Sequence, residues 1–205
     1  MGFIIMMHGL TAVSKTDTAK RLAGRLQNTE IHHSATIRRE LGLSPERLHY
    51  KFDLKDPIFV RKVSKAVYGE MLERAKRSLE NGKNVILDAT YNFVWQRNQL
   101  YGMAQTMKAN VYIIHCACSN KEEIMRRLKR RSGHRERPFD EAVSWETYLS
   151  TLKFSESPIN DRMPDGRRLQ IIRYDTWTGK IVMINAEERD ETYRRIWHCI
   201  EDTKV

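Results

Sequence analysis

The feature that most constrains this chain is a short apolar run that ends in a glycine-containing turn and leads directly into a helical pattern. The run is Phe3-Ile4-Ile5-Met6-Met7, and Gly9 follows it after a single residue. Small and leucine side chains then recur at helical spacing, which predicts a helix from about Lys15 to Leu26. A strand this short and this uniformly apolar is typical of a parallel sheet that is covered on both faces.

The turn itself has the spacing of a phosphate-binding loop. Written as a pattern, residues 9–16 read G-x-x-x-x-S-K-T, beside the phosphate-loop pattern G-x-x-x-x-G-K-[ST]. Backbone N–H groups at the start of a helix carry partial positive charge and hold phosphate oxygens. We expect Lys15 to reach the β- and γ-phosphates of a nucleotide and the Thr16 hydroxyl to bind Mg²⁺. The expected nucleotide contacts are Gly9, Leu10, Thr11, Ala12, Val13, Ser14, Lys15, Thr16 and Asp17.

One position of the pattern differs, because Ser14 stands where the second glycine is expected. Glycine tolerates close backbone approach and positive φ, whereas serine adds a Cβ and a hydroxyl. Three interpretations stay open. The loop binds nucleotide more weakly, the site has decayed, or the segment is a strand–turn–helix that binds no phosphate.

The rest of the chain alternates short apolar runs with helical patterns, which predicts an α/β fold with a parallel sheet. We expect one domain over residues 1–205, with three layers, a mostly parallel five-stranded central sheet, helices on both faces, a small lid at about 132–140 and a C-terminal extension at about 165–205. Strands are expected near residue 31 and at 84–87, 111–116, 169–172 and 181–184. Helices are expected at 36–41, 57–80, 93–108, 120–131, 140–154 and 186–200.

Composition narrows the class of protein. Lys and Arg total 36 against 26 Asp and Glu, so the net charge is +10 over 205 residues. Such a surplus favours a phosphorylated or polyanionic partner. No apolar run approaches the roughly 20 residues that span a bilayer. The chain has three cysteines, an odd number, so we expect no disulfide framework. These features predict a cytoplasmic protein with no membrane partner, and they indicate no protein partner.

Several motifs in this order resemble a known family. The chain is similar to the P-loop kinases of the AAA-type ATPase and polynucleotide 5′-kinase group, and more distantly to chloramphenicol phosphotransferase and zeta toxin. The resemblance covers about Phe3–Phe154 and implies a P-loop NTPase/kinase fold, ATP as phosphoryl donor, Mg²⁺ and a hydroxyl acceptor. The motifs are 6–16 (M-M-H-G-L into K-T), 37–41 (I-R-R-E-L), 84–90 (N-V-I-L-D-A-T) and 126–131 (R-R-L-K-R-R).

The resemblance also marks a departure at the expected general base. The family places an Asp just after the second strand, and here that position is Ala35, which cannot accept a proton. Arg38 matches an arginine that binds substrate phosphate. Asp88 is the first replacement candidate as base, although the resemblance equally allows it to hold Mg²⁺ through water. His33, also a candidate for substrate binding, and His32 are the other candidates, because imidazole suits proton transfer near neutral pH.

The helix expected at 120–131 is strongly basic, and Arg127 and Arg131 lie one turn apart on it. The resemblance implies that such arginines stack on the adenine and neutralise the transferring phosphoryl group; the alternative is a solvated basic face. Residues 49–55 mix aromatic and cationic side chains, which suits either a nucleic-acid end or a loop anchored by its aromatics.

The sequence therefore predicts an ATP- and Mg²⁺-dependent phosphotransferase. Its acceptor hydroxyl belongs to a nucleic-acid 5′ end or to a small metabolite, and the residues do not decide between ATP and GTP. A non-catalytic nucleotide- or RNA-binding module, suggested by Ser14 and Ala35, is the alternative, followed by a slow NTPase.

Overall fold

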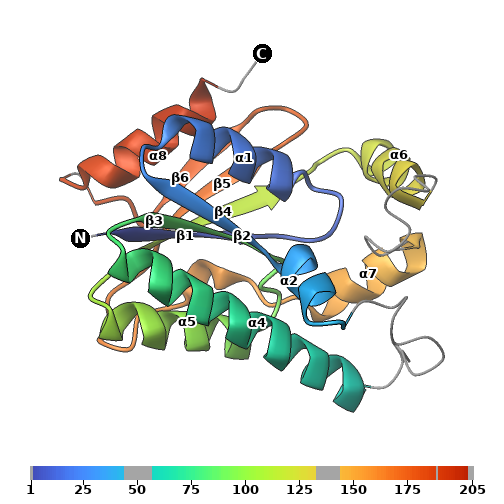
Figure 1. Ribbon diagram of the computed structural model, residues 1–205. Coiled ribbons are helices and arrows are strands. Elements are labelled where there is room, and N and C mark those ends of the chain that lie inside the picture. Colours follow the sequence, from blue (N-terminus) through green and yellow to red (C-terminus); the bar gives the residue numbers. More distant parts are fainter. Residues whose placement is uncertain (1, 44–56, 133–143, 188, 203–205) are drawn as a thin grey trace.

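A computed structural model describes residues 2–43, 57–132, 144–187 and 189–202 (Figure 1). Strands and helices alternate along most of this length, as the apolar patterning predicts. The strands are β1 (Phe3–His8), β2 (Thr29–His33), β3 (Asn84–Asp88), β4 (Asn110–Ala117), β5 (Gln170–Asp175) and β6 (Ile181–Ile184). The helices are α1 (Lys15–Arg25), α2 (Ser34–Glu40), α4 (Pro57–Glu80), α5 (Val94–Thr106), α6 (Lys121–Ser132), α7 (Trp145–Phe154), the short 3₁₀ helix η2 (Pro158–Asn160) and α8 (Glu191–Glu201).

The sheet has the strand order β2-β3-β1-β4-β5-β6. Five strands run parallel, and β6 pairs antiparallel with β5 at the edge. The prediction of five strands is therefore wrong by one, because the last apolar run joins the same sheet. A tight turn connects β5 to β6, and so short a connection permits only antiparallel pairing.

Helices cover both faces of the sheet, as expected for three layers. Figure 1 shows α1 and α8 on one face and α4 and α5 on the other. Strand β1 is buried along its whole length, and its side chains alternate between the two cores. Ile5 and Met7 pack in the core under α1 and α8, whereas Ile4 and Met6 pack in the core over α4 and α5. This two-sided burial explains why the run carries no polar alternation.

Two helices begin later than predicted, and each start has a capping side chain. The closing helix α8 begins at Glu191, where the Asp190 carboxylate accepts the N–H of Tyr193. Helix α7 begins at Trp145, where Ser144 accepts the N–H of Thr147. A capping oxygen satisfies one of the N–H groups that a helix start leaves unpaired, so it favours that boundary.

Two predicted features fall largely outside the described part of the chain. Of the lid expected at about 132–140, only Ser132 is described, as the last residue of α6. The aromatic and cationic stretch at 49–55 also lies outside the described residues.

The carboxyl ends of the parallel strands meet at one edge, where α2, α6 and α7 also lie (Figure 1). Strand β1 leaves the sheet there through Gly9, which has φ of 128° and donates its N–H to the Thr90 carbonyl at 3.3 Å. A Cβ on Gly9 would lie 2.3 Å from the Cys116 carbonyl oxygen of β4. Only glycine fits this position, because both the backbone angle and the space exclude a side chain.

A buried arginine fastens the segment after α7 to the start of α5. Arg97 is fully buried and pairs with Asp161 at 2.5 Å. Its Nη1 donates to the carbonyls of Tyr91 and Glu156 at 2.9 and 3.0 Å. A buried guanidinium is tolerated when it is paired and its N–H groups are satisfied, and both conditions hold here.

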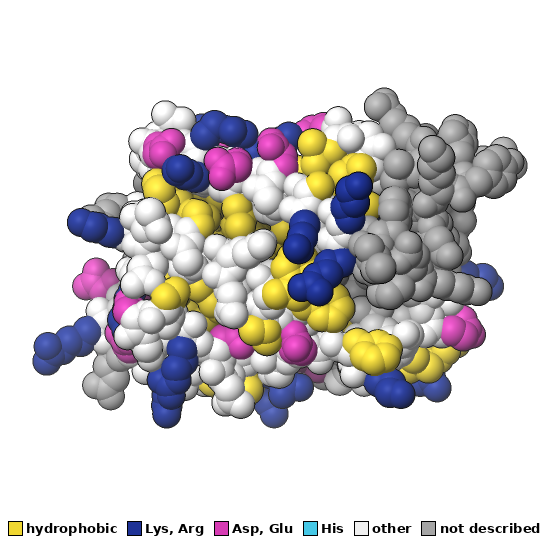
Figure 2. Space-filling model, turned by 90° about the horizontal axis from the view of Figure 1, so that it is seen from below, with side chains coloured by type: hydrophobic (Ala, Val, Ile, Leu, Met, Phe, Trp, Pro, Cys, Tyr) yellow, Lys and Arg dark blue, Asp and Glu magenta, His cyan; other side chains and the backbone are white. Residues whose placement is uncertain are grey.

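On the surface over α4 and α5, the described residues do not gather positive charge into one patch. Figure 2 looks onto this side and shows Lys and Arg side chains spread among acidic and apolar ones. Along the described residues, no helix combines the length and the apolar character that crossing a membrane would require.

The crowding at Gly9 makes a specific prediction. Gly9→Ala should lower the free energy of unfolding by about 2 kcal/mol or more, because the added methyl group meets the Cys116 carbonyl and φ is positive. Urea unfolding measures this loss. Gly102→Ala in α5 is the matched control, since nothing lies within 4 Å of its Cβ position, and we expect it to be neutral or stabilising. Equal effects of the two substitutions would contradict this account.

Candidate functional site

The loop between β1 and α1 holds two non-glycine residues, Ala12 and Ser14, at positive φ. Ser14 adopts the left-handed conformation, with φ 56° and ψ 30°, and Ala12 also has a positive φ of 64°. The Ser14 side chain makes no capping hydrogen bond to the helix. The serine therefore takes the backbone conformation in which glycine is favoured, at a strain of about 1–2 kcal/mol. The first-turn N–H groups of α1 are not capped by this side chain.

Lys15 is the first residue of α1 and folds back over the loop. Its side chain is buried, and Nζ donates to the carbonyl oxygen of Leu10 at 2.6 Å. The ammonium group is thus held against the loop backbone, within the curve of the residues expected to surround the phosphates. The loop pattern predicts that a lysine at this position binds the β- and γ-phosphates of a nucleotide.

Thr16, Asp88 and His33 meet at a single carboxylate oxygen. Thr16 Oγ1 donates to Asp88 Oδ2 at 2.6 Å, and His33 Nδ1 lies 2.7 Å from the same oxygen. The parallel pairing of β2 with β3 places His33 directly beside Asp88, so both side chains point to the α1 face of the sheet. The structure thereby brings together three residues that the sequence analysis proposed separately.

The Asp88 carboxylate is charged in this setting. Only 5% of Asp88 is exposed, and burial by itself raises the pKa of its carboxyl group. Hydrogen bonds from His33 and Thr16, with the nearby charge of Lys15, outweigh burial and hold the pKa below its usual value. A charged, buried carboxylate beside a threonine hydroxyl and a lysine is suited to binding a cation or accepting a proton.

The other residues predicted to act on the acceptor, His32 and Arg38, do not both lie near Asp88. His32 faces α4, where its Nε2 lies 3.0 Å from Ser78 Oγ, on the opposite side of the sheet from Asp88. Its candidacy as a base is therefore not supported by position. Arg38 lies on α2, which begins immediately after β2 and so stands at the same sheet edge as His33. Ala35 is exposed in the first turn of that helix.

Arg127 joins three parts of this edge. Its Nε donates to Glu123 at 2.7 Å, and its Nη1 lies 3.2 Å from both the Ala12 carbonyl of the loop and Thr176 Oγ1 after β5. Hydrogen bonds from Arg126 and Arg127 lower the pKa of Glu123 to about 2, so this carboxylate stays charged at neutral pH. Arg131 lies one turn further along α6 and is partly exposed.

Mg²⁺ fits the donor set found here. Hard oxygen ligands, a hydroxyl and a carboxylate, are the kind that this ion prefers, and it commonly takes only one or two from the protein. Thr16 Oγ1 and Asp88 Oδ2 already lie 2.6 Å apart, at the start of the helix that follows the loop. Among the described residues, no cluster of three or more His, Cys, Asp or Glu forms a separate metal site.

Sequence reasoning missed two features of this edge. The first is the contact of Arg127 with Ala12 and Thr176, which only the fold reveals, because these residues are far apart along the chain. The second is the buried Arg97. A cation among the apolar positions of α5 was the available signal, since charged residues are rarely fully buried without a partner.

Comparisons with known proteins agree with this fold. The family model described as AAA domain matches residues 4–154, close to the extent of the sequence resemblance. No curated protein matches the chain.

Solved structures at low identity share the fold. A protein from Chloroflexus aurantiacus J-10-fl, provisionally described as a kinase, has a TM-score of 0.62 at 15% identity, over 96% of each chain. Chaetomium thermophilum Kti12, in complex with ADP-AlF3, has a TM-score of 0.61 at 18% identity, over 96% of this chain and 98% of that one. A sugar kinase from Janibacter sp. HTCC2649 has a TM-score of 0.58 at 15% identity, over 98% and 93%.

The backbone of Ser14 makes a testable prediction. Ser14→Gly should leave the free energy of unfolding unchanged or raise it by up to about 1 kcal/mol, because relief of the left-handed strain offsets the greater freedom of glycine in the unfolded chain. Nucleotide affinity should be kept or improved. Urea unfolding and titration with Mg-ATP measure both. Ser64→Gly, inside α4, is the control and should be destabilised by about 0.5–1 kcal/mol. Loss of binding in Ser14→Gly would show that the serine has a role of its own.

Proposed function

Because the chain belongs to the AAA-domain family whose model it matches over residues 4–154, we propose that it is an ATP-dependent phosphotransferase acting on a hydroxyl group. The observation that carries this proposal is the convergence of the Lys15 loop with Thr16, Asp88 and His33 at one edge of the sheet. A phosphate-binding loop by itself does not distinguish a phosphotransferase from any other nucleotide-binding protein. A charged carboxylate and an imidazole beside it supply groups that a transfer reaction can use.

Phosphoryl transfer depends mainly on positioning and on stabilising charge. Lys15 would neutralise the phosphates, and the N–H groups of the loop and of the first turn of α1 would orient them. Thr16 would hold Mg²⁺, joined by Asp88 in the arrangement where Asp88 is not the base, and the bound ion would neutralise charge on the phosphate oxygens. Arg127 keeps the loop in shape through its bond to the Ala12 carbonyl. Arg131 remains a candidate for charge stabilisation at the same edge.

A residue other than Ala35 must accept the proton of the acceptor hydroxyl, because alanine has no basic group. Asp88 and His33 are the described side chains at this edge that can take it, and Asp88 is our first choice because its carboxylate is charged. In the alternative arrangement Asp88 serves Mg²⁺ and only orients His33. Loss of a base typically costs about 10²–10⁴-fold in rate, so either arrangement is compatible with an active enzyme.

For the acceptor we favour a small molecule with a free hydroxyl group. The likeness to the Janibacter sugar kinase, over 98% of this chain and 93% of that one, supports it. The described residues on the α4/α5 side also spread their positive charge and do not gather it. A nucleic-acid 5′ end is the alternative that the +10 charge supports. A steep fall of oligonucleotide binding with salt would favour the nucleic acid.

A non-catalytic nucleotide-binding module is the second candidate function. The observations that favour it are Ala35 at the expected base position and the strained Ser14 in the loop. Such a module would bind Mg-ATP but would transfer no phosphoryl group to any acceptor.

Nucleotide binding should appear as thermal stabilisation. Mg-ATP at about 100 times its dissociation constant stabilises a protein by roughly 2.7 kcal/mol, which for this chain length raises Tm by about 5–10 °C. Lys15→Ala should remove the shift, because the buried ammonium group at the loop is lost. Lys20→Ala, on the exposed side of the same helix, should keep it. An equal shift in Lys15→Ala would overturn the phosphate-loop assignment.

The role of Asp88 is tested by Asp88→Asn, with the exposed Asp202→Asn as control. If Asp88 takes the proton, turnover of labelled ATP with an acceptor should fall at least about 100-fold, while Mg-ATP affinity changes little. If Asp88 instead holds Mg²⁺, the affinity for Mg-ATP should fall and the affinity for metal-free ATP should not. Near-normal turnover with unchanged affinity would leave His33 as the candidate base.

A further inference from the structure

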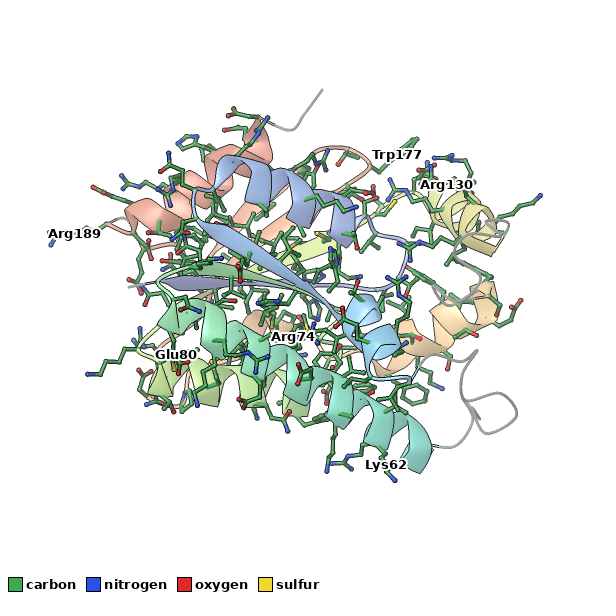
Figure 3. All side chains as sticks on the ribbon, viewed as in Figure 1. Lys62, Arg74, Glu80, Arg130, Trp177 and Arg189 are labelled. Atoms are coloured by element: carbon green, nitrogen blue, oxygen red, sulfur yellow. The ribbon has the colours of Figure 1, made fainter. Side chains whose placement is uncertain are left out.

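The outer edge of β6 is apolar and exposed. β6 is the last strand of the sheet, so no described strand pairs with its outer side. Its residues, Ile181–Ile184, include no charged residue, proline or glycine. Val182 is 42% exposed and Met183 is 45% exposed, and these neighbours lie on opposite faces of the sheet. Figure 3 shows Trp177, in the turn between β5 and β6, also projecting outward. The hairpin therefore combines an open row of backbone groups with uncovered apolar side chains.

The opposite edge of the sheet carries a protection that β6 lacks. That edge is β2, whose Glu30 carboxylate is paired with Lys83. Charged side chains on an edge strand oppose pairing with another chain, and folded proteins commonly use them for that purpose. An apolar edge without such a charge accepts a further strand more readily. Of the two edges, β6 is therefore the one at which pairing is expected.

The hydrogen bonds of the β5–β6 hairpin show which backbone groups of β6 face outward. The N–H of Asp175 donates to the carbonyl of Lys180 at 2.9 Å, so this carbonyl points toward β5. The pairing of β6 with β5 continues from there without a bulge. Because backbone groups alternate in direction along a strand, those of Val182 also point toward β5. The N–H and C=O groups of Ile181 and Met183 therefore face outward.

We propose that two copies of this chain form a dimer through the outer edges of their β6 strands, paired antiparallel with a two-fold axis at Val182. In this register Ile181 lies opposite Met183 of the partner subunit. Both residues turn their backbone groups outward, so each of the two symmetry-related pairs exchanges both of its N–H···O bonds. The two sheets then form one continuous sheet. This inference does not depend on the proposed function, because β6 contributes no residue to the candidate site.

The side chains in this register are complementary. Ile181 packs beside Met183 of the partner subunit on the face that carries α1 and α8, and Val182 meets its own copy on the other face. Cross-strand pairs of apolar and β-branched side chains stabilise a sheet. The charges agree as well, since Lys180 precedes the strand and Glu187 is the first charged residue after it. Antiparallel pairing brings the start of one strand to the end of the other, so unlike charges approach.

The alternative registers are less favourable. A shift of one residue would set side chains of opposite faces against each other. A two-fold axis at Met183 keeps the faces matched but places Ile181 opposite Asn185 of the partner subunit. Asn185 has a positive φ of 55°, which ends the extended strand, so this pair cannot continue the ladder. An axis at Val182 therefore forms more backbone hydrogen bonds than an axis at Met183.

The first experiment measures self-association of the full chain under reducing conditions by sedimentation equilibrium, at about 5–500 µM. The strand is short, so the dimer should be weak, with a dissociation constant on the order of 10–100 µM. Val182→Lys places two like charges at the axis and should raise this constant at least about tenfold. Leu152→Lys on α7 is the matched control, because Leu152 is 52% exposed, and it should change nothing. Thermal unfolding checks that both variants are folded.

The second experiment tests the register by disulfide cross-linking. Val182 and its copy would form a non-hydrogen-bonded pair with Cα atoms about 4.5 Å apart, so Val182→Cys meets the geometry of a disulfide. Met183 and its copy would lie on a diagonal at about 7–8 Å, which is too far. Mild oxidation should therefore link Val182→Cys into covalent dimers and leave Met183→Cys unlinked. The wild type gives the background from the native cysteines.

Three results would overturn the proposal. The first is a monomer throughout the concentration range. The second is a dimer that Val182→Lys and Leu152→Lys affect equally, because its contact would then lie elsewhere. The third is cross-linking of Met183→Cys in place of Val182→Cys, which would exclude the two-fold axis at Val182. Each of these results leaves the binding of Mg-ATP untouched, so the proposed function stands or falls separately.

Discussion

One carboxylate oxygen, Asp88 Oδ2, holds the candidate site together. It accepts hydrogen bonds from Thr16 on α1 and from the ring of His33 at the end of β2. A buried carboxylate requires partners of this kind, because leaving it unpaired costs several kcal/mol. The start of α1 and the end of β2, from which α2 follows, therefore both bond to one atom at the end of β3. A metal ion or an acceptor hydroxyl that enters the site must replace bonds that now stabilise the fold.

Much of the fold could be predicted from apolar runs. Residues 3–7 show no polar alternation, and this identified a parallel strand covered on both faces. The confirmed family resemblance rested on the same run and on the residues after it. The predicted number of strands in the central sheet was wrong because residues 181–184 form the same short apolar run whether they join that sheet or lie outside it. Capping by Asp190 and Ser144 set helix boundaries that hydrophobic spacing alone could not locate.

The sequence identifies the individual residues of the candidate site but not the contacts between them. Parallel strands bring their carboxyl ends to one edge, so the general location of Lys15 and Asp88 followed from topology. Whether His32 or His33 faces that edge depends on strand register, because a shift of one residue exchanges the two faces. The pairing of His33 with Asp88 resolves this. The link from Arg127 to Thr176 depends on the packing of α6 against the β5–β6 turn, and no local pattern indicates it.

The contacts of Arg97 determine which segments of the chain must open together. Arg97 and Asp161 are 64 residues apart along the chain, and the same guanidinium also holds the carbonyls of Tyr91 and Glu156. The N–H of Val94 and the N–H of Glu156 are bonded across the same junction. Breaking the guanidinium contacts therefore exposes both backbone segments at once. In hydrogen-exchange terms the start of α5 and the chain after α7 form one cooperative unit, although the sequence keeps them far apart.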